Sequence, residues 1–340
     1  MKKTVIIAEA GVNHNGQLKL AKQLINAAAE AKVDFVKFQT FKAEQLVLKR
    51  AKKAEYQIRN TQNNDSQFSM LKKLELSEQD HRELIAYCKE KNIGFLSSAF
   101  TVDSQKYLDN LELPLVKIPS GEITNYPYLK HIATTKTPVY LSTGMSTLEE
   151  VEAAIKVLCS GERTKEDITL LQCNTEYPTP YNDVNLNAML TLKEKFKVNV
   201  GYSDHTLGVE IPIAAVALGA TVIEKHFTLD KTMQGPDHLA SLSPEELKQM
   251  VLSIRNTEAA LSGHGEKKPS NSELKNIAIA RKSICITQSI AKGERIQPYH
   301  LDSLRPGNGI SPMNWEEILD KKVNKDLEKG HQLDWEDIEA

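Results

Sequence analysis

Cysteine and long apolar runs are scarce in this sequence of 340 residues, and each shortage excludes a class of protein. The four cysteines, Cys88, Cys159, Cys173 and Cys285, are isolated and form neither a CxxC pair nor a zinc-ribbon spacing. We therefore expect reduced, mostly buried thiols in a cytoplasmic protein. No apolar run approaches the ~18 residues of a membrane span, and the N-terminal run stops at Glu9, too early for a signal peptide.

Net charge is also nearly absent. The 43 Lys+Arg almost balance the 45 Asp+Glu and leave a formal charge of −2. This balance argues against nucleic acid or an anionic membrane as a partner, although a local basic pocket is compatible with it. No GxGxxG follows the first apolar run and no Walker A sequence occurs, so these nucleotide-binding motifs are missing.

The chain does contain a regular alternation of short β-rich apolar runs and helical patterns. Continuous apolar runs are typical of parallel strands buried on both faces. The expected strands are residues 4–10, 34–39, 94–97, 115–118, 139–142, 168–173, 199–202 and 221–226. Eight β–α units within about 255 residues favour a (β/α)8 TIM barrel, with a doubly wound open sheet as the alternative.

A polar stretch separates this region from a second one of different character. Residues 262–275 read SGHGEKKPSNSELK, a composition typical of a linker. Beyond it, short β patterns alternate with glycine turns such as Lys292-Gly293-Glu294. We therefore expect a barrel domain over residues 1–261, a linker over 262–280 and a small β-rich domain over 281–340.

Polar or ionisable residues follow every expected strand. In a TIM barrel the C-terminal strand ends together build the active site, so these residues should gather in one place. They are Glu9, Lys37, Gln39, Ser98, Lys117, Ser120, Glu122, Ser142, Thr175, Tyr177, Ser203, His205, Glu224 and His226, and Asp237 follows in the turn after the last strand.

Lys37 and Lys117 point to an anion site. A lysine inside a barrel mouth is costly unless it meets an anion, and hydroxyls at Ser98, Ser120 and Ser203 would add donors for a phosphate or carboxylate. Taken singly, each residue also fits a solvated loop position or a structural ion pair such as Lys37–Glu224.

His205 and His226 end neighbouring expected strands. Neutral imidazoles about one strand spacing apart can share a divalent cation, with Glu9 or water completing the shell. Buried structural histidines are an equally good interpretation of this pair.

Several long motifs resemble one family nearly from end to end. These are EAGVNHNG, VKFQTFKAEQL, KIPSGEITN, STGM, CNTEYPTP, GYSDHTLG, EKHFTLDKTMQGPDH and RPGNGISP, which look like the bacterial sialic acid (nonulosonic acid) synthases. The resemblance implies a TIM barrel, a linker and a C-terminal antifreeze-like (SAF) domain. It also implies a domain-swapped homodimer in which the small domain covers the partner's active site.

The reaction implied by the resemblance condenses phosphoenolpyruvate with an N-acetylated aldose and water. With N-acetylmannosamine it yields N-acetylneuraminate, a sialic acid of cell-surface polysaccharides, and phosphate; this is the main expectation. The alternative is a legionaminic acid synthase that uses 2,4-diacetamido-2,4,6-trideoxymannose. The family uses a divalent metal, usually Mn²⁺ and sometimes Mg²⁺ or Co²⁺.

The resemblance also implies a role for each site residue. His205 and His226 match the metal ligands, and Glu122 matches a carboxylate that handles protons. Glu9, Tyr177 and Asp237 match positions near the sugar or metal, with Glu9 and Asp237 as further catalytic candidates. The positions around phosphoenolpyruvate are Lys37, Gln39, Ser98, Lys117, Ser120, Thr175 and Ser203, and Arg305 matches an arginine that reaches the sugar's N-acetyl group across the dimer.

One departure from the family and two rival functions remain open. Phe38 and Phe41 replace histidines found in some members, and we expect the ring of Phe38 to reshape the sugar side of the pocket. A Schiff-base aldolase using Lys37, Lys117 or Lys225 is a distant enzymatic alternative. A carbohydrate- or ice-binding protein is a non-enzymatic alternative, suggested by the small C-terminal domain. This alternative does not explain the polar residues at the strand ends.

Overall fold

The protein is described by a computed structural model over residues 3–61 and 65–339. It contains two compact units, Met1–Ser262 and Gly263–Ala340, which are described separately. Within the described residues, no helix is both long and apolar enough to cross a membrane.

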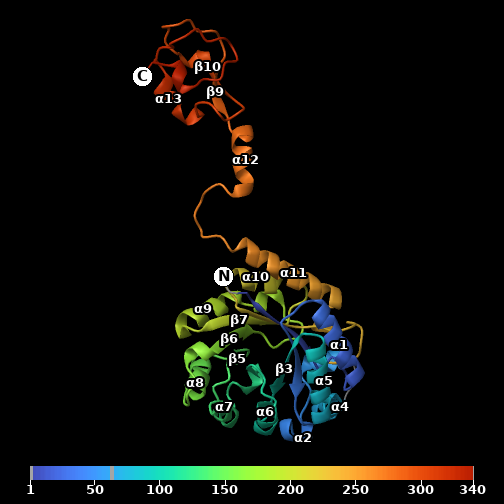
Figure 1. The fold of residues 1–340 in the computed structure, drawn as a ribbon. Coiled ribbons are helices and arrows are strands. Elements are labelled where there is room, and N and C mark those ends of the chain that lie inside the picture. The colour runs from blue at the N-terminus through green and yellow to red at the C-terminus, as the bar shows by residue number, and fades with distance from the viewer. Residues whose placement is uncertain (1–2, 62–64, 340) are drawn as a thin grey trace. The chain divides into compact units, whose positions relative to one another are not determined.

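Parallel strands in the first unit close into a barrel in chain order, with β1 paired to both β2 and β8. Figure 1 shows helices around these strands. The TIM barrel prediction is confirmed and the open-sheet alternative is wrong; each strand boundary lies within two residues of its expected position. The strands are β1 (Val5–Gly11), β2 (Phe35–Thr40), β3 (Gly94–Ala99), β4 (Val116–Ile118), β5 (Val139–Ser142), β6 (Ile168–Cys173), β7 (Asn199–Asp204) and β8 (Val222–His226).

Several of the surrounding helices begin where a side chain accepts a hydrogen bond from a free backbone N–H group. Ser77 and Asp80 form a capping box at the start of α5, and Ser243 and Glu246 form another at the start of α11. The outer layer consists of α1 (Leu18–Glu30), α5 (Glu78–Glu90), α6 (Val102–Asp109), α7 (Tyr126–Ile132), α8 (Leu148–Leu158), α9 (Leu186–Phe196), α10 (Glu210–Ala217) and α11 (Pro244–Ala260).

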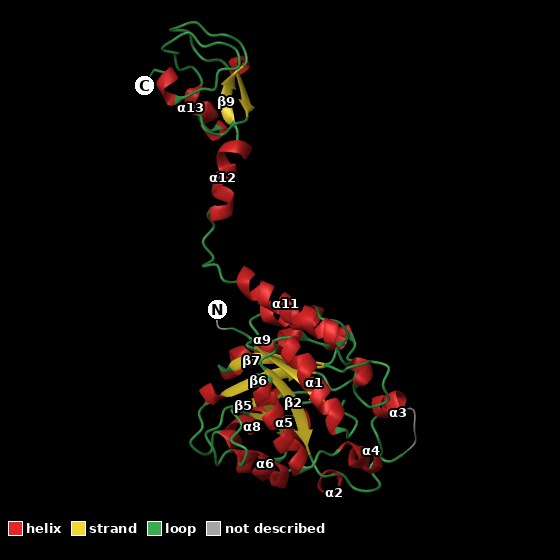
Figure 2. Ribbon diagram, turned by 45° about the vertical axis from the view of Figure 1, so that its right-hand side comes forward, coloured by secondary structure: helices red, strands yellow, loops and turns green. Residues whose placement is uncertain are grey.

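A long connection between β2 and α5 adds three short helices to the barrel. These are α2 (Ala43–Leu46), α3 (Glu55–Thr61) and α4 (Gln67–Leu74). In Figure 2 they lie at the same end of the barrel unit, away from α11 and the N-terminus. Residues 62–64, between α3 and α4, lie outside the described part of the chain.

Two apolar layers hold the barrel together. The outward side chains of the strands, such as Ile6, Val36 and Leu141, pack against the helices in one large cluster. Inside the barrel, Ile7, Leu96 and their neighbours form a second, smaller cluster. Burial of apolar surface in both layers fixes the strands and therefore the side chains at their ends.

The second unit has a small core of its own. Strands β9 (Ser283–Ile286) and β10 (Leu301–Leu304) pair antiparallel, and α13 (Trp315–Ile318) packs Ile318 into their apolar cluster. Helix α12 (Asn271–Ala280) occupies the second half of the range expected to be a linker. A cap stabilises the start of this helix, because Glu273 accepts a hydrogen bond from the Ser270 backbone N–H (2.7 Å).

Candidate active site

The inner surface of the barrel changes from apolar to polar toward the C-terminal strand ends. Successive strand side chains point alternately inward and outward, so the second residue after an inward apolar one also points inward. Ile7 and Leu96 are followed in this way by Glu9 and Ser98. The polar layer formed by this alternation is Glu9, Lys37, Ser98, Lys117, Ser142, Cys173, Ser203 and Glu224.

A cavity of about 650 Å³ opens over this polar layer, a size typical of small-molecule sites. Most of the residues that the sequence assigns to the site line it. These are Glu9, Lys37, Gln39, Ser98, Lys117, Ser120, Thr175, Tyr177, Ser203, His205, His226 and Asp237. Glu122 and Arg305 are not among the lining residues.

The two lysines share one buried carboxylate at the bottom of the cavity. Glu224 lies 3.8 Å from Lys37 Nζ and 3.5 Å from Lys117 Nζ, and it accepts a hydrogen bond from Ser203 Oγ (3.0 Å). Lys37 also pairs with Glu9 at 2.7 Å. The Lys37–Glu224 pair foreseen as an alternative therefore exists, but within a cavity wall, where an entering anion would meet both amines.

Hydroxyl groups complete this anion-binding surface. Lys37 Nζ donates to Ser98 Oγ (3.0 Å), and Lys117 Nζ donates to Ser142 Oγ (2.8 Å). Ser142 was predicted only as a polar strand end, and Glu224 as a polar strand end and an ion-pair partner of Lys37, neither of them with a role at the anion. Both lie two residues after an inward apolar position, which is the pattern that places them in the polar layer.

Burial and neighbouring acids act in opposite directions on the lysine pKa values. Burial lowers the pKa of Lys117 more than the attraction of Glu224 raises it, so that pKa is lowered. For Lys37, burial is outweighed by Glu224 and Glu9, and the pKa is raised. Burial likewise raises the pKa of Glu224, but Lys117 and Lys37 outweigh it and the net change is downward. Lys117 is therefore the lysine with the less complete charge compensation.

His205 and His226 lie side by side at the rim, with ring centroids 5.4 Å apart. Burial lowers the pKa of His205 to about 4, and burial together with His205 lowers that of His226 well below its usual value. Both rings are therefore neutral at neutral pH and retain a lone pair. His205 Nδ1 contacts the carbonyl of Asn174, which leaves Nε2 as its free nitrogen.

The histidine pair fits a divalent cation whose remaining ligands are water or substrate. His226 Nδ1 is buried and makes no hydrogen bond to any described residue, and the carboxylate of Asp237 lies 3.7 Å away. Among residues 3–61 and 65–339, no group of three or more His, Cys, Asp and Glu side chains is arranged to hold a metal ion. A cation at this position would depend on water or substrate ligands in addition to the described side chains.

An aromatic stack links the histidines to helix α3. The ring centroids of Tyr177 and His205 are 4.1 Å apart, and those of Tyr177 and Tyr56, which belongs to α3, are 5.0 Å apart. Asn60 Nδ2 donates to the carbonyl of Pro236 (2.7 Å), so α3 also contacts the loop after β8. Tyr56 lines the cavity. Its position was not predicted, because α3 follows no barrel strand directly.

Comparison with known proteins settles the family. A model of the NeuB family matches residues 24–267, and a model of the SAF domain matches residues 281–339. The chain belongs to the NeuB family. The predicted resemblance is thus confirmed, together with the predicted combination of a barrel and a SAF domain.

Three relatives show where this NeuB-family chain lies within the family. It is 55% identical to an N,N'-diacetyllegionaminic acid synthase of Campylobacter jejuni, over 98% of this chain and 99% of that protein. It is 50% identical to the enzyme of the same name from Legionella pneumophila, over 98% and 94%. A solved N-acetylneuraminic acid synthetase of Leptospira borgpetersenii, in complex with citrate, is 35% identical with a TM-score of 0.70, over 81% of this chain and 90% of that chain.

Glu122, predicted to handle protons, is not among the residues that line the cavity of this NeuB-family barrel. It belongs to a single 3-10 turn, Ser120–Glu122, whose first two residues line the cavity. Its own carboxylate accepts a hydrogen bond from Asn125 Nδ2 (2.5 Å), and burial raises its pKa. Its catalytic role remains a prediction from the family resemblance.

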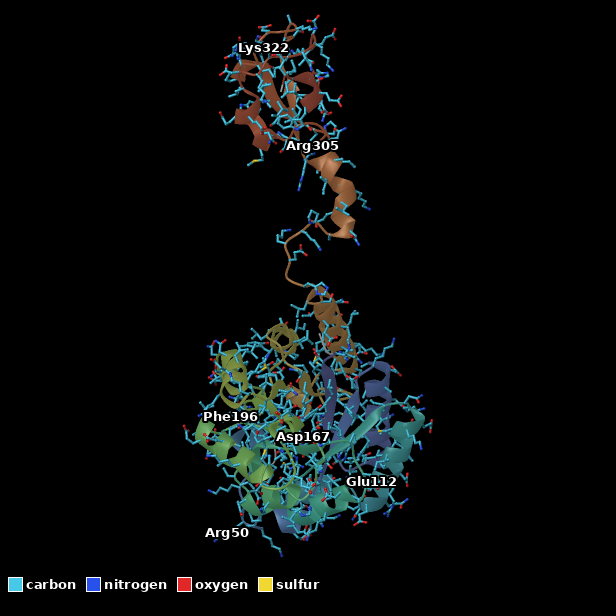
Figure 3. All side chains as sticks on the ribbon, turned by 60° about the vertical axis from the view of Figure 1, so that its left-hand side comes forward. Arg50, Glu112, Asp167, Phe196, Arg305 and Lys322 are labelled. Atoms are coloured by element: carbon cyan, nitrogen blue, oxygen red, sulfur yellow. The ribbon has the colours of Figure 1, made fainter. Side chains whose placement is uncertain are left out.

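Arg305 belongs to the second unit. Its Nε donates to the carbonyl of Ala280 at the end of α12 (3.0 Å). Figure 3 labels Arg305 in this unit. The following peptide bond to Pro306 is cis. Its predicted contact with a partner's sugar site also remains a prediction.

Two expectations based on single residues are wrong. Phe38 does not line the cavity; its ring points outward and packs on Phe95, with centroids 5.7 Å apart. Lys225, one of the possible Schiff-base lysines, is fully buried on the outer side of β8, where it pairs with Asp204 and donates to the carbonyl of Thr206 (2.6 Å). Of the aldolase lysines, only Lys37 and Lys117 face the cavity.

Proposed function

We propose that this chain is an N,N'-diacetyllegionaminic acid synthase. It would condense phosphoenolpyruvate with 2,4-diacetamido-2,4,6-trideoxymannose and water and release phosphate. The support is its identity of 55% and 50% to two synthases of that name, against 35% to the sialic acid synthetase. This reverses the order expected from the motifs, and N-acetylneuraminate synthesis from N-acetylmannosamine becomes the alternative.

The polar layer of the barrel is the observation that carries the chemistry. Phosphoenolpyruvate brings a phosphate and a carboxylate, and Lys37 and Lys117 with the hydroxyls of Ser98, Ser120 and Ser142 offer buried cationic and neutral donors. Such preorganised donors in a site with little water bind and orient an anion strongly. Electrostatic attraction of this kind needs no excess of positive charge over the whole chain.

The reaction then follows from the placement of groups around the bound anion. The methylene carbon of phosphoenolpyruvate forms a bond to the aldehyde carbon of the sugar, water adds at its second carbon, and phosphate leaves. A cation held by His205 and His226 would polarise the aldehyde oxygen and help to place water. Glu9 and Asp237 are carboxyls that line the cavity near these histidines and can accept or hold protons there.

Two further features belong to this proposal. By family resemblance, the small unit of one protomer would cover the cavity of its partner in a domain-swapped homodimer, with Arg305 near the N-acetyl group. The four free cysteines support a reducing, cytoplasmic location.

The choice of sugar is tested by comparing two substrates. We expect kcat/KM for the diacetamido trideoxy sugar to exceed that for N-acetylmannosamine by at least about tenfold, since single apolar groups in a pocket discriminate by about that factor. Steady-state phosphate release with both sugars measures the ratio. A preference for N-acetylmannosamine would reject the legionaminate proposal and restore the sialate alternative.

Removal of metal tests the role of the histidines. With EDTA present we expect turnover to fall by at least about a hundredfold and to return with added Mn²⁺, because a bound cation contributes several kcal/mol of charge stabilisation. Mn²⁺ binding, followed by its paramagnetic resonance signal, should weaken in His226→Ala. The matched control is His264→Ala, at an exposed position. Full turnover in EDTA, or unchanged Mn²⁺ binding by His226→Ala, would reject this site.

A further inference from the structure

The cavity has a second wall whose chemistry differs completely from that of the polar layer. We call it the apolar wall; it consists of Val12, Phe41, Met70, Leu71, Leu74 and Phe100, all of which line the cavity. The same six residues belong to one packed apolar cluster, separate from the main barrel core. Such a surface offers no favourable contact to the charged phosphate and carboxylate of phosphoenolpyruvate.

The apolar wall stands directly over the strands that carry part of the polar layer. Val12, Phe41 and Phe100 are the residues just after β1, β2 and β3, the strands of Glu9, Lys37 and Ser98. Met70, Leu71 and Leu74 come from α4, in the connection added between β2 and α5. A second substrate that reacts with an anion held at the lysines must therefore reach toward this wall or toward the histidine side.

The wall is preorganised by its own packing. The rings of Phe41 and Phe100 meet edge to face, with centroids 6.0 Å apart. Helix α4 is anchored at its start by Ser66, whose side chain accepts a hydrogen bond from the Ser69 backbone N–H (3.2 Å). Met70 and Leu74 are almost fully buried. A fixed apolar surface of this kind selects ligands by shape and by lack of polarity.

The two candidate sugars differ in polar and apolar groups that such a wall can discriminate. N-acetylmannosamine carries hydroxyls at its fourth and sixth carbons, whereas the diacetamido trideoxy sugar carries an acetamido group and a methyl group there. An apolar surface offers no partner for a hydroxyl, which therefore loses its hydrogen bonds with water. Methyl groups gain from leaving water on the same surface.

We propose that the apolar wall selects the trideoxy sugar by contacting its methyl-bearing end, with Leu71 and Phe100 as specificity-determining residues. This inference rests on the proposed function and adds to it the part of the cavity that distinguishes the sugars. Leu71 and Phe100 are half-buried members of the wall, so their side chains are the ones that a ligand can contact without displacing the cluster core.

The test compares the two sugars in the full-length enzyme carrying Leu71→Gln. We expect the ratio of kcat/KM, diacetamido trideoxy sugar over N-acetylmannosamine, to fall at least about tenfold, as expected for a polar group placed in an apolar pocket. Leu71→Met, which remains apolar, should keep the ratio within about threefold. Leu252→Gln makes the same change on the exposed side of α11 and should leave the ratio unchanged.

A second variant covers the case in which Leu71→Gln does not fold. Phe100→Tyr adds one hydroxyl and keeps the ring, and it should lower the same ratio in the same direction. If wild type prefers the trideoxy sugar but neither variant changes the ratio, the apolar wall is not the determinant and the proposed function stands. If wild type prefers N-acetylmannosamine, both the proposed function and this inference are overturned.

Discussion

Replacing Lys117 by methionine should abolish most of the activity without weakening the fold. Lys117 Nζ is buried in the cavity wall, where it donates to Ser142 Oγ (2.8 Å) and faces Glu224 at 3.5 Å. Loss of a buried charge that pairs with a ligand costs roughly 2–5 kcal/mol. Since about 1.4 kcal/mol corresponds to a factor of ten, kcat/KM for phosphoenolpyruvate should fall by about thirtyfold to several thousandfold.

The same substitution should leave thermal stability equal or higher. The pKa of Lys117 is lowered in the folded chain because burial outweighs the attraction of Glu224. Below that folded pKa, the charged amine therefore costs stability, and methionine removes the cost. Glu224 still has Lys37 at 3.8 Å and the hydrogen bond from Ser203.

A matched control separates this effect from a general loss of charge. Lys136 pairs with Glu162 at 2.8 Å, with side chains that are 70% and 77% exposed. Lys136→Met should change neither turnover nor the unfolding midpoint noticeably, because exposed pairs contribute little. Steady-state kinetics and thermal unfolding of both variants decide the matter. Retention of wild-type kcat/KM by Lys117→Met would contradict the proposed role of Lys117 in binding phosphoenolpyruvate.

The two-residue period of the strands explains which residues of the site could be predicted from the sequence. Because the inward residues alternate, the strand period puts Lys37 with Gln39 and Glu224 with His226 on common faces, and the structure places all four on the cavity. The same rule puts Phe38 on the opposite face of β2, where it packs in the outer core. The expectation that Phe38 shapes the sugar pocket failed because it followed a motif and not the alternation.

Residues beyond the strands were not predictable in the same way. Strand β4 ends at Ile118, and the 3-10 turn that follows takes Glu122 out of the alternating pattern, so that it is not among the residues that line the cavity. Tyr56 and Met70 reach the cavity from α3 and α4, whose path over the barrel depends on tertiary packing. No local period in the sequence predicts where these two helices run. For Arg305, the expected contact would involve a second chain and remains a prediction from the family resemblance.

Removal of Glu224, unlike removal of Lys117, should cause a large loss of stability. Glu224→Ala takes away the only carboxylate within ion-pair distance of Lys117 among the described residues and leaves Lys37 with Glu9 alone. Leaving one partner of a buried ion pair uncompensated costs about 3–5 kcal/mol. At roughly 2–4 °C per kcal/mol for a unit of this size, the unfolding midpoint of the barrel should fall by about 6–20 °C.

A second substitution distinguishes loss of charge compensation from loss of packing. In Lys117→Met/Glu224→Gln the amine and the carboxylate disappear together, and most of the lost stability should return, since buried pairs are often replaced by uncharged groups at little cost. Activity should not return, because the donor for the phosphoenolpyruvate anion is still missing. Glu162→Ala, at the exposed pair with Lys136, is the control and should lie within about 0.5 kcal/mol of wild type. A double variant as unstable as Glu224→Ala would show that Glu224 acts through packing, and that Lys117 does not depend on it for charge.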